Sequence, residues 1–207
     1  MNKKPRTHKV KAAHPGRYEI RLGGSGGQGI ILAAIVLAEA VGVYHGKHVC
    51  QSQSYGPEAR GGYSKAEVVI SDQPIDYPKA MNPDLFLAMN QASCDNYFLD
   101  LKPEGLLIVD STLVHQVPTS RAVSIPFTEI ARKQWGKEMV ANMVALGAVV
   151  YLSKVVPVKK LEQALAARIP AGTLQINTKA IQEGIKAAQK YDLASLPRSI
   201  FPEEEEV

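Results

Sequence analysis

The feature that most constrains the fold of this 207-residue chain is a glycine-rich stretch, residues 21–29, which reads RLGGSGGQG and is followed at once by the apolar run 30–38. The segment before it, residues 18–22, is short and strand-like. Since glycine alone adopts positive φ without strain, we expect a strand, a tight loop and a buried helix in that order. Such a loop brings backbone N–H groups and the positive helix end to one point, where a phosphate or carboxylate can bind.

Gly24, Gly26 and Gly29 have the G-x-G-x-x-G spacing of dinucleotide-binding folds. The acidic residue expected about 20 positions later, to bind a ribose 2′-OH, is missing, because residues 45–51 read HGKHVCQ. A phosphate-binding NTPase loop does not fit either, since two isoleucines follow the last glycine in place of Lys and Ser or Thr. Three interpretations stay open: an anion site, a contact with a partner, and a loop that only lets a helix pack tightly on a sheet.

A second loop is predicted over residues 53–62, QSYGPEARGG, after a strand over 47–52. Its three glycines and one proline are incompatible with a helix or a central strand. Tyr55, Glu58 and Arg60 supply an aromatic ring, a carboxylate and a bidentate hydrogen-bond donor. Because loops after the early strands of a parallel sheet gather at the carboxyl ends of those strands, we expect this loop to neighbour the glycine loop. The alternative is an ordinary surface turn with solvated charges.

The rest of the chain alternates short buried strands with helices. Strands are predicted over 65–70, 85–89, 106–110 and 123–125, and helices over 91–101, 127–135, 142–152, 157–168 and 177–190. This order predicts a Rossmann-like three-layer α/β/α fold, with a mostly parallel sheet and a helical C-terminal part. The helix over 142–152 is apolar on nearly every face, so it should be buried or lie in a subunit interface.

Charge is concentrated at the two ends of the chain. Residues 1–17 hold six Lys and Arg and no acid, and residues 203–206 are four consecutive glutamates. We therefore expect a disordered basic extension over 1–17, one domain over 18–192 and a tail over 193–207. The extension has no interleaved aromatic residues and no nucleic-acid module follows it, so we expect no nucleic-acid partner.

The sequence also bears on location and metal binding. The apolar runs 30–38 and 143–152 are too short to span a bilayer and no secretory signal is evident, so we expect a cytoplasmic protein with no membrane partner. Cys50 and Cys94 form no C-x-x-C pair, so we expect no iron–sulfur cluster or zinc site within this chain. The five histidines lack spacing such as H-E-x-x-H, so we assign no metal ligand and no catalytic residue.

Four motifs occur in order along the chain. They are the glycine loop over 23–29, the second loop over 53–62, Asn142-Met143-x-Ala145-Leu146-Gly147, and Asn177-x-x-Ala180-x-x-x-Gly184. Together they resemble the gamma subunit, or gamma domain, of the 2-oxoacid:ferredoxin oxidoreductases, over roughly residues 18–190. The resemblance implies a non-autonomous subunit of an enzyme that oxidatively decarboxylates a 2-oxoacid, transfers the acyl group to coenzyme A and reduces ferredoxin.

The resemblance also implies partners and cofactors. The chain is expected to bind no cofactor alone, whereas the complex uses thiamine diphosphate between alpha and beta subunits, iron–sulfur clusters, and coenzyme A as a substrate. The implied partners are the alpha and beta subunits, a delta subunit as a further candidate, and ferredoxin. Among 2-oxoacids, 2-oxoglutarate is favoured over pyruvate and 2-oxoisovalerate on overall similarity.

On this basis we predict that one set of residues forms the junction with the other subunits near coenzyme A: Gly24, Gly26, Gly27, Gln28 and Gly29, with Tyr55, Glu58 and Arg60. Two alternatives stay open. One is a stand-alone Rossmann-like module that binds NADP or a flavin, and the other is a purely structural assembly subunit.

Overall fold

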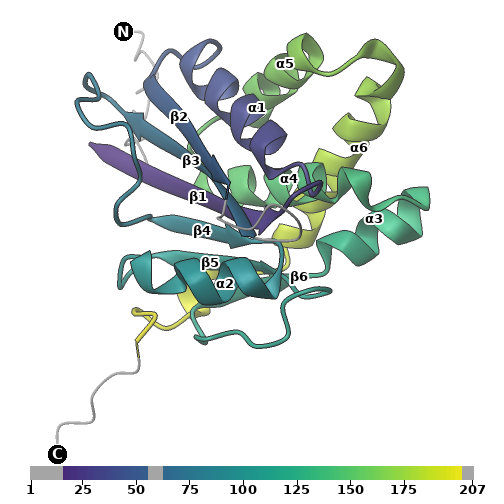
Figure 1. Cartoon of the computed structure of the whole chain (residues 1–207). Helices are drawn as coiled ribbons and strands as arrows, with labels where there is room; N and C mark the ends of the chain where they lie inside the picture. The colour runs from purple at the N-terminus through teal and green to yellow at the C-terminus, as the bar shows by residue number, and fades with distance from the viewer. Residues whose placement is uncertain (1–15, 56–62, 202–207) are drawn as a thin grey trace, which may run out of the picture.

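The sheet is built around β1 (Arg17–Ser25), the strand that leads into the glycine loop. The structure is a computed structural model that describes residues 16–55 and 63–201, and in this part of the chain six strands form one mixed sheet in the order β2-β3-β1-β4-β5-β6 (Figure 1). The other strands are β2 (His48–Tyr55), β3 (Tyr63–Ser71), β4 (Leu85–Ala88), β5 (Leu106–Asp110) and β6 (Ala122–Ile125). Strands β1, β4, β5 and β6 are parallel, whereas β3 runs antiparallel to both β1 and β2.

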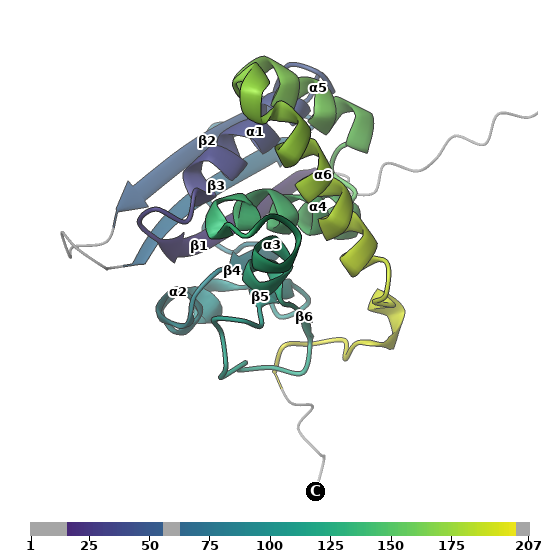
Figure 2. The ribbon, with the colours of Figure 1, turned by 90° about the vertical axis from the view of Figure 1, so that its right-hand side faces the viewer.

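The predicted α/β class is confirmed, although β2, β3 and β4 follow one another without a helix and the last four helices come after the last strand. The helices are α1 (Ile30–Gly42), α2 (Gln91–Tyr97), α3 (Phe127–Trp135), α4 (Ala141–Ser153), α5 (Val158–Arg168) and α6 (Ala171–Ala188), with short 3₁₀ turns η1 (Phe98–Asp100), η2 (Glu138–Val140) and η3 (Leu193–Ser195). Helices α1, α3, α4, α5 and α6 lie on one face of the sheet, and α2 lies on the other (Figures 1 and 2).

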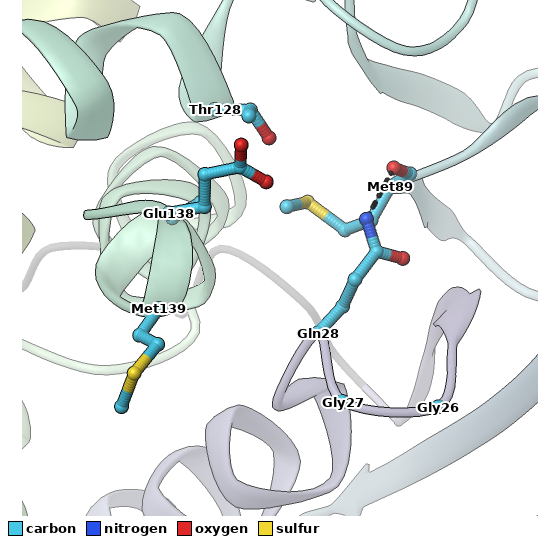
Figure 3. Close-up of a pocket in the computed structure, with 8 residues that line it drawn as sticks. Gly26, Gly27, Gln28, Met89, Thr128, Glu138 and Met139 are labelled. Atoms are coloured by element: carbon cyan, nitrogen blue, oxygen red, sulfur yellow. Dashed lines mark hydrogen bonds between the residues drawn. The ribbon is translucent and has the colours of Figure 1, made fainter. Parts of the chain in front are cut away.

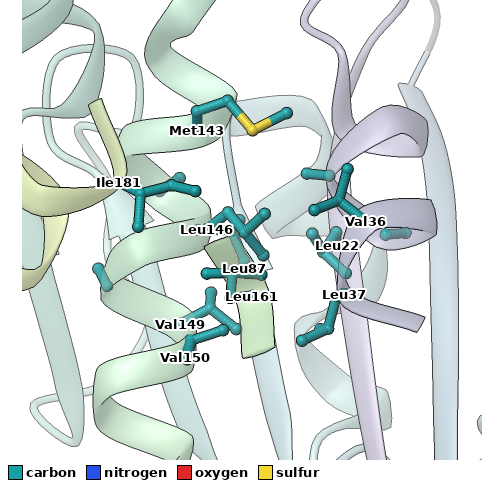
Figure 4. Packing of buried hydrophobic residues seen from close by; sticks show 14 of the residues in the cluster. Leu22, Val36, Leu37, Leu87, Met143, Leu146, Val149, Val150, Leu161 and Ile181 are labelled. Carbon is teal, nitrogen blue, oxygen red and sulfur yellow. The ribbon is translucent and has the colours of Figure 1, made fainter. Parts of the chain in front are cut away.

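The main core lies between the sheet and the five-helix layer. Leu22 of β1 and Leu87 of β4 face Leu37 of α1 and Leu146 of α4, and all four side chains are buried (Figure 4). Burial of each such side chain contributes roughly 1.5–3 kcal/mol to folding. The sheet thereby holds α1 and α4 side by side, with their first turns at the same rim.

Helices α4 and α6 cross with almost no space between their backbones. A Cβ added at Gly147 would lie 2.1 Å from the Ile181 carbonyl oxygen, and one at Gly184 would lie 1.8 Å from the Val144 carbonyl oxygen. Both motif glycines therefore serve helix packing. The expectation that the apolar helix is buried is confirmed, since every residue of α4 but Tyr151 is buried.

A buried charge cluster lies on the other face of the sheet. Arg21, 2 % exposed, donates to Glu67 of the neighbouring strand at 3.0 Å and also to the Asp100 carboxylate. Lys65 Nζ lies 3.1 Å from the same Glu67 carboxylate. Both cations make cation–π contacts with the ring of Tyr97, whose centroid lies 5.3 Å from the Arg21 guanidinium carbon and 5.2 Å from Lys65 Nζ. Register between β1 and β3 is therefore fixed by charge as well as by backbone pairing.

Four predicted boundaries are wrong. The helix predicted over 91–101 ends as α2 at Tyr97, and the chain continues as the 3₁₀ turn η1. Residues 53–55 continue the edge strand β2 instead of starting a loop, because each of them pairs with a residue of β3. Gly23 and Gly24 continue β1, so the turn itself is shorter than predicted. Helix α6 begins at Ala171, well before residue 177. Proline is favoured at the start of a helix, because the N–H that it lacks would have no partner within the helix, and Pro170 stands at that start.

The described end of the chain crosses to the α2 side of the sheet. Ile200 is 3 % exposed, packs in the second core, and its N–H donates to the Pro103 carbonyl at 2.8 Å. The predicted tail therefore contacts the protein at Leu193, Leu196 and Ile200. Residues 1–15 and 202–207 lie outside the described residues, and the division at residues 17 and 192 stays a prediction.

Candidate functional site

The glycine loop joins β1 to α1 and is closed by the side chain of Gln28. Gln28 Oε1 accepts from the Ser25 N–H at 2.6 Å, and its Nε2 donates to the Met89 carbonyl at 2.9 Å (Figure 3). Gly27 and Gly29 have φ of 89° and 73°, in the left-handed region that favours glycine. The loop is thus tied to the end of β4 before the chain enters α1.

The loop glycines differ in what requires them. A Cβ at Gly24 would lie 2.8 Å from Gln28 Oε1 and 3.0 Å from the Ile30 side chain, so Gly24 leaves room for the closing amide. Gly26 has no positive φ, is exposed, and a Cβ there would meet no described atom within 4 Å. Nothing within the described fold therefore explains glycine at position 26.

Asn142, in the first turn of α4, fixes the loop to its neighbouring helix. Its Nδ2 donates to the Gly29 carbonyl at 3.0 Å, its Oδ1 accepts from the Met143 N–H at 2.9 Å, and the residue is 4 % exposed. The first turns of α1 and α4 consequently lie together. Sequence reasoning noted Asn142 within a motif but missed this contact; the signal was a single amide at the start of an otherwise apolar helix.

A cleft of about 290 Å³ opens between the glycine loop and the start of α4. Thr128 and Glu138 face it from one side, opposite Gln28 and Met89, whereas the Met139 side chain points away (Figure 3). The lining residues are Gly26, Gly27, Gln28, Met89, Thr128, Glu138, Met139 and Ala141. This volume is at the lower end of small-molecule sites. Sequence reasoning missed Met89, Thr128, Glu138 and Met139, because no local motif marks them.

A buried carboxylate supports one wall of the cleft. Asp110 is fully buried at the end of β5 and accepts from Thr128 Oγ1 at 2.5 Å, from Thr128 N–H at 3.1 Å and from Thr112 N–H at 3.0 Å. Since the Thr128 hydroxyl donates inward, its oxygen presents lone pairs to the cleft. Glu138 is exposed and pairs with Arg132 at 2.6 Å, an ion pair that solvent screens strongly.

The second predicted loop starts on the same rim as the glycine loop. In the sheet, Tyr55 at the end of β2 lies opposite Ser64 of β3, which lies opposite Gly24 of β1. Tyr55 is 69 % exposed. Glu58 and Arg60 lie outside the described residues, so their place at this rim stays a prediction.

The strand order bears on the dinucleotide alternative. In dinucleotide-binding folds the strand that carries the ribose-binding acid is parallel to the first strand and adjacent to it. Here antiparallel β3 takes that position, so the rim beside Gly24 holds the start of a strand instead of a carboxyl end. The geometry therefore disfavours NADP or flavin binding at this loop.

The described residues show no arrangement of three or more His, Cys, Asp and Glu side chains that could hold a metal ion. Iron–sulfur clusters are commonly held by four thiolates, and the whole chain has two cysteines. Burial, with Asp95 as the smaller cause, raises the pKa of the Cys94 thiol to about 11, which opposes the thiolate form that metals bind. The residues present do not fit a resident cluster. Within residues 16–55 and 63–201, no helix combines the length and apolar character that crossing a membrane requires.

Comparisons with known proteins point to one family. Residues 19–187 match the family model described as pyruvate ferredoxin/flavodoxin oxidoreductase. In Methanothermobacter marburgensis, 2-oxoglutarate synthase subunit KorC is 46 % identical over 176 residues, which cover 81 % of this chain and 95 % of that protein. From the same organism, pyruvate synthase subunit PorC is 30 % identical over 155 residues, covering 73 % and 86 %.

A solved structure extends the comparison to three dimensions. The gamma subunit of keto/oxoacid ferredoxin oxidoreductase from Geobacter sulfurreducens superposes with a TM-score of 0.76 at 45 % identity, covering 84 % of this chain and 99 % of that chain. Fold and site define a Rossmann-like α/β protein whose glycine loop is closed by its own glutamine. The chain belongs to the pyruvate ferredoxin/flavodoxin oxidoreductase family. The resemblance to gamma subunits that the four motifs indicated is confirmed.

Proposed function

We propose that the chain is the gamma subunit of a 2-oxoglutarate:ferredoxin oxidoreductase, which oxidatively decarboxylates 2-oxoglutarate to its acyl-CoA and reduces ferredoxin. One observation carries the choice of substrate: within a single organism, identity is 46 % to the 2-oxoglutarate synthase subunit and 30 % to the pyruvate synthase subunit. Because both relatives come from one organism, distance between organisms does not account for the difference.

The subunit is proposed to work with alpha and beta subunits, and with a delta subunit where one is present, in the cytoplasm. Thiamine diphosphate, the iron–sulfur clusters and the contact with ferredoxin then belong to those partners. The composition of this chain supports that division, since two separate cysteines do not suit a cluster. Coenzyme A is the second substrate of the complex.

The rim of the glycine loop is proposed to be the junction with a neighbouring subunit near coenzyme A. Gly24 and Gln28 shape the loop, Gly29 is the N-cap of α1, and Gly26 and Gly27 leave the outer side of the loop without Cβ atoms. The positive end of α1 favours a carboxylate or phosphate there. The exposed side chains of Tyr55 (69 %) and Met139 (80 %) are of types enriched in subunit interfaces.

The substrate assignment is tested by reconstitution with the remaining subunits. The alpha, beta and delta subunits are purified with and without this chain, and reduction of ferredoxin is measured with 2-oxoglutarate or pyruvate in the presence of coenzyme A. We expect turnover only with the chain present, and faster turnover with 2-oxoglutarate. Equal rates with pyruvate would refute the substrate, and full activity without the chain would refute the subunit role.

The junction is tested separately with substitutions on the rim. Gly26→Val adds a branched side chain where the described fold leaves space, and Arg60→Ala removes the predicted donor. Each variant is assembled, and both the amount of complex and its turnover are measured. Reduced turnover in a complete complex supports a role at the site, whereas reduced assembly alone favours the purely structural subunit. If both quantities are unchanged for both variants, the proposed junction is wrong.

A further inference from the structure

The two edges of the sheet are built differently. At one edge, β6 has four residues, and the Tyr191 hydroxyl donates to the Ser124 carbonyl, which covers a backbone acceptor. At the other edge, β2 has eight residues that pair with β3 one by one without a bulge. No described strand pairs with the outer side of β2 (Figures 1 and 2).

Strand β2 also lacks the usual devices that protect an edge. Exposed edges commonly carry lysine, proline or a bulge that discourages pairing with another chain. Residues 48–55 read HVCQSQSY, with no lysine and no proline. The Gln51 side-chain amide folds back and donates to the Ser52 carbonyl at 3.1 Å. The Met89 N–H donates to the Gly23 carbonyl, so the odd-numbered residues of β1 turn their backbone to β4 and the even-numbered ones turn theirs to β3. Through the one-to-one registers of β1 with β3 and of β3 with β2, the backbone of Cys50, Ser52 and Ser54 faces β3. The backbone of Val49, Gln51, Gln53 and Tyr55 therefore faces the outer edge.

We propose that β2 pairs with β2 of a second copy of this chain, antiparallel and about a two-fold axis at Ser52, so that the two sheets become continuous. This inference does not depend on the substrate or on the proposed junction. In that register Ser52 lies opposite its own copy, Cys50 opposite Ser54, Gln51 opposite Gln53, and Val49 opposite Tyr55. The outward-facing backbone of Gln51 then meets that of Gln53, and that of Val49 meets that of Tyr55, as antiparallel pairing requires.

A second copy suits this edge because the strand complements itself. Residues 49–55 carry no charge, so a two-fold axis brings no like charges together. Large exposed apolar side chains lie at both ends of β2: Tyr55 is 69 % exposed at one end. At the other end, Val43 is 72 % exposed. Val43 follows Gly42, and a Cβ added at Gly42 would lie 2.5 Å from the Val49 side chain of β2. Antiparallel pairing brings Tyr55 of one copy to the Val49 end of the other, which is an aromatic and β-branched pair.

The test uses the full-length chain in sedimentation velocity over a range of concentrations. We expect the wild type to reach a mass near twice 22.4 kDa. Gln51→Lys with Gln53→Lys sets lysine opposite lysine twice and should weaken the dimer more than tenfold. Gln51→Glu with Gln53→Lys sets glutamate opposite lysine in this register alone and should restore the dimer. Gln163→Lys with Gln182→Lys adds the same charge on exposed faces of α5 and α6 and should leave the dimer intact.

Thermal unfolding of each variant verifies that the fold is retained. A monomeric wild type at all concentrations overturns the proposal, as does a lysine pair that stays dimeric. If the variant with Gln51→Glu and Gln53→Lys does not dimerise, the proposed register is wrong. Hydrogen exchange adds a further outcome: β2 amides that become protected only when the alpha and beta subunits are added would show that the edge receives a partner strand in place of a second copy.

Discussion

Asn142 donates from Nδ2 to the carbonyl of Gly29 at 3.0 Å, and the same nitrogen would lie 2.4 Å from a Cβ added at Gly29. One contact therefore joins the start of α4 to the N-cap of α1 and excludes any side chain at position 29. Since Gly29 ends the loop that lines the cleft, the position of that loop depends on a residue of the C-terminal half of the chain.

Gly29→Ala should destabilise the protein strongly, because alanine at φ of 73° is strained and its Cβ would overlap Asn142. We expect the free energy of unfolding in urea to fall by about 1–3 kcal/mol from backbone strain, and further from the overlap. Gly26→Ala is the matched control and should stay within about 0.5 kcal/mol of the wild type. Equal stability of the two variants would contradict the geometry of the loop.

Gly147→Ala and Gly184→Ala should each force α4 and α6 apart, since the added carbon would overlap a backbone carbonyl of the facing helix. We expect losses above about 3 kcal/mol, in the range of severe core overpacking. Gly172→Ala lies in the same α6 with no described atom within 4 Å of its Cβ, and should gain up to about 1 kcal/mol from helix propensity. Thermal unfolding compares the three variants, and a tolerated Gly184→Ala would refute the close crossing.

Arg21→Met should remove a buried cation and leave Glu67, which is 3 % exposed, with Lys65 as its remaining cationic partner. Loss of one member of a buried pair typically costs about 3–5 kcal/mol. Adding Glu67→Gln to Arg21→Met should recover part of that loss, because the unpaired charge is gone. A double-mutant cycle measured by urea unfolding gives the coupling, and additive effects would show that the two residues do not interact.

The Cys94 thiol should resist alkylation at pH 8, because it is fully buried and burial raises its pKa to about 11. Iodoacetamide followed by mass spectrometry should find Cys50 modified first and Cys94 modified only after unfolding in urea. The raised pKa also means that stability from the protonated thiol is complete below its ordinary value of 9.0 and is lost as pH rises toward 11.

Cys94→Ala supplies the control for this pH dependence. Its stability at pH 8 should be somewhat lower, since a buried side chain is truncated. Its further decline between pH 9 and pH 11 should be shallower than that of the wild type, as the titrating group is gone. Parallel declines in the two proteins would show that the Cys94 thiol does not titrate on unfolding.

Sequence periodicity was sufficient for the α/β class, because buried strands such as 106–110 and the apolar helix 142–152 have clear local patterns. The direction of β3 was not predictable in this way, since a strand of alternating residues reads the same in either direction. Edge strands are also poorly marked: residues 53–55 resemble a loop in composition, yet β3 supplies enough pairing to extend β2 over them.

The candidate site was predicted in part. Glycine spacing identified the loop, but the closing role of Gln28 and the cleft walls at Thr128 and Glu138 depend on contacts between residues far apart in the chain. The burial of Arg21 could not be predicted, because its partners Glu67 and Asp100 come from β3 and η1 and only the folded sheet brings them together. Gly147 and Gly184 were recognised as parts of motifs, while their physical role became clear from the helix crossing.

The reversed direction of β3 limits what protein engineering can do with this scaffold. Introducing an acid at Lys47 or His48 to create a nicotinamide enzyme would place it at the far end of the sheet from the glycine loop, since β2 begins there and runs toward the rim. A redesign would have to replace the whole β2–β3 hairpin, because no point substitution can supply the missing parallel strand.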